Sequence, residues 1–100
     1  MSCANYTIGE IMYILDNGGC IEVVKDVDHQ NGSYDGIKTY IRQSYVMSYP
    51  EELSIHMLKI LCDKGLLVKY EEYEDKEDQK IIMIAVSRNG KNKLQKKERI

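Results

Sequence analysis

The chain has 100 residues, of which 43% are apolar and 30% are charged, with a single proline. A chain of this length rarely divides into two cores, which excludes a second domain. The 14 Lys and Arg against 16 Asp and Glu leave a net charge of −2, which excludes attraction of the whole molecule to phosphate or to an anionic membrane. Any nucleic-acid binding must therefore come from a local patch.

The cysteine pattern bears on location and on metal binding. Cys3, Cys20 and Cys62 are odd in number and widely spaced, which fits neither a disulfide framework nor a paired-thiolate metal site. We therefore expect reduced thiols, no metal and a cytoplasmic protein. No apolar run reaches the length of a membrane-spanning helix, so we expect no membrane association.

The first third of the chain predicts one helix and one strand. Thr7 and Glu10 have the spacing of a capping box, so a helix is expected over 7–17. A β-branched run at 20–24 predicts a short strand, and the turn-forming residues of 25–36 predict a loop. The expected helix would bury one apolar face, formed by Ile8, Ile11, Met12 and Leu15.

The remaining chain predicts three helices and a hairpin. The run 37–45 can form a short helix that buries Ile37, Tyr40 and Ile41. A second capping box, Ser48 with Glu51, predicts a helix over 49–64. Two strand-like runs separated by charged residues predict a hairpin over 66–86, and a last helix is expected over 88–98. The inward positions of the first and third expected helices would form the core seam, through Ile11, Leu15, Leu53, Met57 and Leu61.

Parts of the sequence resemble the winged helix-turn-helix regulators of the MarR and PadR type and the small archaeal DNA-binding members of that group. In these proteins an L-x-x-L-x-x-x-G-L-[LIV] run leads into a charged hairpin and then a [TS]-x-x-G-[KR] start of the last helix. The stretch 10–15 is also similar to the opening helix of the group. The matching positions are Leu58, Leu61, Gly65, Leu66 and Leu67 before the hairpin, and Ser87, Gly90 and Lys91 after it.

The resemblance implies a fold and a function. The fold would be α+β, a single winged helix-turn-helix domain with a three-helix core, a β-hairpin wing and a C-terminal helix. Residues 37–44 would form the first helix of the motif, 49–64 the recognition helix and 70–80 the part of the wing near a minor groove. The implied function is sequence-specific transcription regulation on double-stranded DNA in an archaeal or viral system, without enzyme activity or a cofactor.

The DNA-binding candidates are cations, hydrogen-bonding groups and one apolar residue. They lie on the two expected helices of the motif, in the turn between these helices and at the start of the last expected helix. A homodimer would double their phosphate contacts, and we expect contacts through the terminal helices. An ordinary solvated surface is the competing interpretation for each of them. The candidates are Lys38, Arg42, Gln43, Ser44, Tyr45, Ser48, Ile55, His56, Lys59 and Lys91.

An uneven charge distribution favours a different function. Residues 1–50 carry a net charge of −3, residues 51–87 carry −4 and residues 88–100 carry +5. The hairpin contains most of the central acids, and phosphate would be repelled by it. The alternative is therefore a winged-helix protein-protein interaction module, or a nucleic-acid mimic, that acts through its acidic hairpin. No catalytic triad, phosphate-binding glycine loop or paired-carboxylate site is found, so we expect no enzyme.

Overall fold

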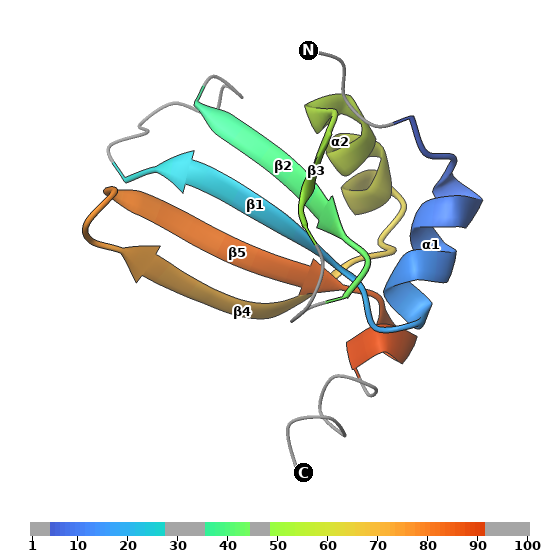
Figure 1. Cartoon of the computed structure of the whole chain (residues 1–100). Helices are drawn as coiled ribbons and strands as arrows, with labels where there is room; N and C mark the ends of the chain where they lie inside the picture. Colours follow the sequence, from blue (N-terminus) through green and yellow to red (C-terminus); the bar gives the residue numbers. More distant parts are fainter. Residues whose placement is uncertain (1–4, 28–35, 45–48, 92–100) are drawn as a thin grey trace, which may run out of the picture.

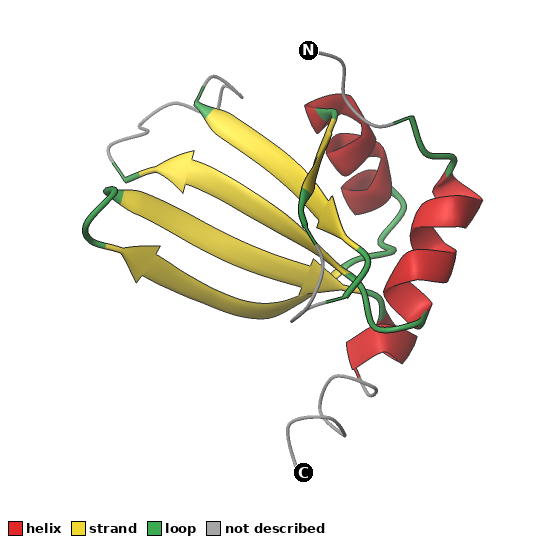
Figure 2. Ribbon diagram, viewed as in Figure 1, coloured by secondary structure: helices red, strands yellow, loops and turns green. Residues whose placement is uncertain are grey.

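A computed structural model of the chain describes residues 5–27, 36–44 and 49–91. These residues form a five-stranded sheet with two helices and a short helical segment at 88–91, so strands dominate the fold (Figure 1 and Figure 2). The elements in chain order are α1 (Ile8–Asp16), β1 (Cys20–Asp26), β2 (Ile37–Arg42), β3 (Glu51–Leu53), α2 (Ile55–Asp63), β4 (Val68–Asp75) and β5 (Lys80–Val86).

The sheet is antiparallel throughout, with the strand order β3-β2-β1-β5-β4. The long central strand β1 pairs with β2 on one side and with β5 on the other. One edge is the short strand β3, and the other edge is β4. Both helices lie toward one end of the sheet, opposite the end that carries the β4–β5 turn (Figure 1).

Helix α1 confirms the first predicted helix. The Glu10 amide donates to Thr7 Oγ1 at 3.1 Å, and the Thr7 amide donates to Glu10 Oε1 at 2.8 Å, which completes the predicted capping box. After the helix, a side chain at Gly19 would place its Cβ 2.6 Å from the carbonyl oxygen of Arg42. Glycine is therefore needed where the α1–β1 connection passes the end of β2.

The main core lies between the two helices and one face of the sheet. Alternate residues of each strand point to this face, since successive side chains of a strand point to opposite sides. The predicted seam residues all belong to this core, with Met57 partly buried at its margin. Its buried members are Ile11, Leu15, Ile21, Val23, Ile41, Leu53, Leu58, Leu61 and Ala85.

The predicted helix over 37–45 is wrong. The segment forms β2 instead, and its Ile37, Thr39 and Ile41 point to the core face, paired with alternate residues of β1. Thr39 is buried. The helical interpretation relied on the apolar residues 37, 40 and 41. Positions 37, 39 and 41 fit the alternation of a strand equally well, but this pattern is hidden because Thr39 is polar. The predicted loop 25–36 also loses its first two residues to β1, and 28–35 lie outside the described residues.

The predicted helix over 49–64 is only partly right. Residues 51–53 form β3, and the helix begins after Ser54, whose Oγ accepts from the Met57 amide at 3.1 Å. The structure thus assigns the cap to Ser54, while the predicted cap Ser48 lies outside the described residues. Helix α2 then ends close to the predicted position, and Gly65 follows with a φ of 67°.

The hairpin is confirmed, because β4 and β5 pair within the predicted 66–86. Ser87 caps a helix that is described over 88–91, and the rest of the predicted helix 88–98 lies outside the described residues. The expected three-helix core with a helix-turn-helix is wrong, because β2 and β3 replace the helix of 37–45 and the start of the next helix. The fold is α+β, but it is a sheet with two covering helices.

Candidate functional site

The side of the sheet opposite α1 and α2 is called the open face here. Over the described ranges no helix is placed on it (Figure 1). The strand registers align one row of side chains across all five strands, in the order Glu52, Tyr40, Glu22, Ile84 and Glu71. The other residues of this face are Cys20, Val24, Asp26, Lys38, Arg42, Val68, Tyr70, Tyr73, Asp75, Lys80, Ile82 and Val86.

The floor of the open face is a second apolar cluster. Cys20, Ile84 and Val86 are buried there, and Val68, Tyr70 and Ile82 pack against them. Burial raises the pKa of the Cys20 thiol, which is about 11 even though the nearby charge of Arg42 acts to lower it. Cys20 is therefore a structural thiol rather than a nucleophile.

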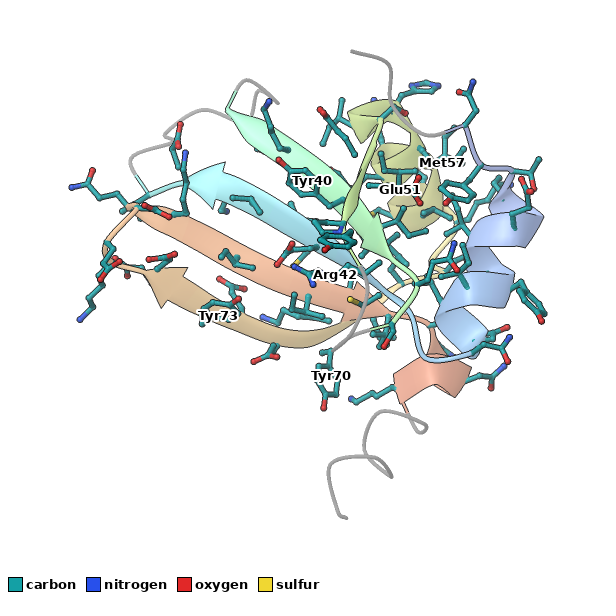
Figure 3. All side chains as sticks on the ribbon, in the orientation of Figure 1. Tyr40, Arg42, Glu51, Met57, Tyr70 and Tyr73 are labelled. Carbon is teal, nitrogen blue, oxygen red and sulfur yellow. The ribbon has the colours of Figure 1, made fainter. Side chains whose placement is uncertain are left out.

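Charged side chains lie over this floor. Arg42 Nε is 3.7 Å from Glu22 Oε1, and the two side chains are 27% and 15% exposed, so this ion pair is better shielded than an ordinary surface pair. Figure 3 shows Arg42 reaching from β2 toward β1. The pKa of Tyr73 is raised first by burial and then by the negative charges of Glu22 and Glu71, which places all of these groups in one electrostatic environment.

Among the residues that the structure describes, acidic groups outnumber basic groups on the open face. Its five carboxylates are those of Glu22, Asp26, Glu52, Glu71 and Asp75, and its three cations are Lys38, Arg42 and Lys80. Two of the cations are engaged, because Arg42 pairs with Glu22 and Lys80 pairs with Asp26. The site therefore presents a negative surface with three tyrosines, Tyr40, Tyr70 and Tyr73 (Figure 3).

The β4–β5 turn extends the negative surface beyond the sheet. Glu77 and Asp78 are exposed in the turn, and Glu74 is exposed on the adjacent strand. The Asp78 amide donates to Asp75 Oδ1 at 3.3 Å, which fixes the turn. From 68 to 86 the chain carries six acids and three lysines, so the whole hairpin is negative.

The structure separates the residues that the sequence placed in one DNA-binding site. Lys38 and Arg42 lie on the open face, and Gln43 and Ser44 follow directly after β2. The predicted residues of α2 cover the opposite side of the sheet, and Lys91 lies in the helical segment 88–91 at the end of the described chain. Tyr45 and Ser48 lie outside the described residues. The predicted residues on α2 are Ile55, which is partly buried against the core, and the exposed His56 and Lys59.

A hollow of about 320 Å³ lies beside the end of α1, away from the open face. Ser87 Oγ donates to Asp16 Oδ1 at 2.6 Å and accepts from the Gly90 amide at 2.9 Å. The hydrogen bond between Ser87 and Asp16 joins α1 to the helical segment 88–91. The Asp16 carboxylate is the acceptor in this bond. The other lining residues are Met12, Gly65, Leu66, Arg88 and Asn89, and no histidine that could activate the serine is among those described.

Sequence reasoning included Glu71 and Tyr73 only as parts of the acidic hairpin, and it missed their neighbour Glu22. The three residues come from strands that only the sheet brings together. The signal for Glu22 was present, because the alternation in 20–26 puts it on the side opposite Ile21 and Val23. No local pattern connects it to Glu71 or Tyr73, which are about fifty residues away.

The described residues also bear on metal binding and on membrane insertion. Among the residues that the structure describes, no three His, Cys, Asp or Glu side chains are grouped to hold a metal ion. No described helix is long and apolar enough to cross a membrane. Comparison of the chain with protein-family models, curated proteins and solved structures finds no match, so the site must be interpreted from its own residues.

Proposed function

We propose that this chain is a binding protein, not an enzyme, and that its open face with the acidic hairpin binds a basic segment of a partner protein. The observation that carries the proposal is the excess of carboxylates, together with tyrosines, on a sheet face that no described helix covers. This is the protein-interaction alternative of the sequence analysis without its winged-helix fold.

The chemistry of the face matches a cationic partner. Carboxylates accept charge-assisted hydrogen bonds from Lys and Arg side chains, and these bonds are about twice as strong as neutral ones. A tyrosine ring attracts a cation over its face by about 0.5 to 1 kcal/mol at an exposed site. Tyr73 is 46% exposed, so part of its ring is accessible to such a partner.

The same features argue against a phosphate backbone as the ligand. An excess of carboxylates repels phosphate, and Arg42, the main cation of the predicted DNA site, is paired with Glu22. Lys59 lies on α2, on the other side of the sheet from Lys38 and Arg42. DNA binding and a homodimer stay predictions. The helix-turn-helix that motivated them is not part of the fold.

The test compares a basic peptide with DNA as ligands of the full chain. We would titrate a fluorescent Lys- and Arg-rich peptide and, separately, a mixed-sequence DNA duplex, each at low and at physiological salt. We expect the peptide to bind and the duplex not to bind. Binding of the duplex without the peptide would favour the DNA-binding prediction, and binding of neither would refute the proposal.

Matched variants locate the binding surface. Glu52→Gln removes one carboxylate from the open face, and Asp63→Asn removes one exposed carboxylate from α2. We expect the first to weaken peptide binding by about two- to fivefold, because one exposed ionic contact contributes at most about 1 kcal/mol. The second should leave binding unchanged. Equal effects of both variants would show that the peptide responds only to net charge.

A further inference from the structure

The outer strand of the acidic hairpin, β4, forms one edge of the sheet. It is eight residues long, whereas the opposite edge strand, β3, has three residues. Within the part of the chain that the structure describes, no strand pairs with the outer side of β4. A long free edge presents unpaired N–H and C=O groups, which are a template for another strand.

One hydrogen bond identifies the outward groups. The Val27 amide donates to the Gln79 carbonyl at 3.0 Å, so the odd-numbered residues of β5 direct their backbone groups toward β1. The even-numbered residues therefore face β4, where their register partners are Glu71, Tyr73 and Asp75. It follows that Glu72 and Glu74 direct their N–H and C=O groups away from the sheet.

The charge of the edge selects the kind of strand that can join it. The regular part of β4 follows the register shift between Lys69 and Glu71, and it contains four acids within five residues. A second copy of β4 would place carboxylates opposite carboxylates, which is unfavourable. A segment rich in Lys and Arg would instead place cations beside carboxylates on both faces of the sheet.

We propose that a basic, extended segment of the partner protein pairs with the outer edge of β4 as a sixth strand. This proposal rests on the proposed function and specifies its geometry. The backbone of Glu72 and Glu74 exchanges hydrogen bonds with the added segment. Its alternate side chains then lie beside Glu71, Tyr73 and Asp75 on the open face, and beside Glu72 and Glu74 on the helix side.

Amide hydrogen exchange of the full chain tests the backbone pairing directly. The probe is an eight-residue peptide of alternating Lys and Val, and the control is the same peptide with every backbone amide nitrogen methylated, which retains the charge but loses the backbone donors of both edges. We expect the amides of Glu72 and Glu74 to exchange at least about tenfold more slowly with the first peptide. The Tyr73 amide, which faces β5, should change little.

A pair of substitutions at one position gives an independent measurement. Glu74→Gln removes the charge, and Glu74→Pro removes both the charge and the outward N–H, which an edge strand tolerates because that group is not used in the sheet. We expect the proline variant to bind the peptide about two- to tenfold more weakly than the glutamine variant, the effect of one lost hydrogen bond. Thermal unfolding of both variants checks that the sheet is intact.

The outcomes separate the two proposals. If the parent and N-methylated peptides bind equally, and the exchange of Glu72 and Glu74 stays fast, strand pairing is refuted while the binding of basic segments stands. If neither peptide binds, the proposed function itself is refuted. If the two amides become protected without peptide as the protein concentration rises, β4 pairs with a second copy, and the proposed occupant is wrong.

Discussion

Replacing Thr39 by Val should stabilise the protein, although most core substitutions do the opposite. Thr39 is 1% exposed, and its Oγ1 has no hydrogen-bond partner among the described residues. A buried hydroxyl without a partner costs about 1 to 3 kcal/mol. Valine has nearly the same shape and replaces this hydroxyl by a methyl group, which packs between the register partners Val23 and Leu53.

For Thr39→Val we expect the free energy of unfolding to rise by about 1 to 2 kcal/mol. This value is below the full cost of a buried, unpaired hydroxyl because local relaxation around Thr39 recovers part of that cost. For a domain of this size, this corresponds to a thermal midpoint about 4 to 16 °C higher. Urea unfolding should show a higher midpoint with an unchanged slope. Thr39→Ser retains the hydroxyl, loses a methyl group and should destabilise. An unchanged or lower midpoint for the valine variant would refute the buried strand position of Thr39.

Three further predictions follow from described contacts. Ser87→Ala should lower the free energy of unfolding by about 2 to 4 kcal/mol, because the cap on the Gly90 amide and the hydrogen bond to the Asp16 carboxylate are lost together. Denaturant unfolding measures this loss of stability. Iodoacetamide should label the exposed Cys62 well before the buried Cys20, whose raised pKa also keeps it protonated, and mass spectrometry of the peptides distinguishes them. The hydrogen bond from Tyr6 to Glu51 raises the pKa of Tyr6, so this contribution to stability is complete below pH 10 and is lost as the pH rises through the folded-state pKa. Alkaline unfolding of Tyr6→Phe should show a weaker pH dependence than the parent.

Elements with local and redundant signals could be predicted from the sequence. Helix α1 has its capping box, an apolar face and a terminating glycine pair between Thr7 and Gly19. The β4–β5 hairpin has two strand-like runs, of which the second is rich in β-branched residues, on either side of a charged turn. In both cases, each local preference agrees with the tertiary structure, so no long-range information is needed.

The middle of the chain could not be predicted because two periodicities fit the same residues. Apolar positions 37 and 41 are separated by one helical turn, but they also lie on one face of a strand. Ser48 and Glu51 imitate a capping box, although Glu51 belongs to β3 and Ser54 is the cap. The pairing of β2 with β1 decides between the two periods, and such pairing is not encoded in a local window.

The candidate site shows the same limit. Arg42 was selected from the sequence as a cation at the end of a helix, where phosphate binding is a reasonable role. In the sheet, the same side chain lies beside Glu22, and its surroundings become acidic. The identity of a charged residue was therefore visible in the sequence, while the sign of the surface around it depended on which strands are neighbours.

The placement of both helices toward one end of the sheet gives the molecule a thick end and a thin end. At the thick end, two layers of side chains shield the backbone hydrogen bonds from water. Toward the β4–β5 turn, the helix side of the sheet instead has a hollow of about 140 Å³ lined by Val23, Lys25, Ile37, Glu72, Ile81 and Met83. Local opening costs least where few apolar contacts are lost. The thin end should therefore fray and close again while the thick end stays folded, so that the partner strand proposed above can be exchanged there without unfolding the protein.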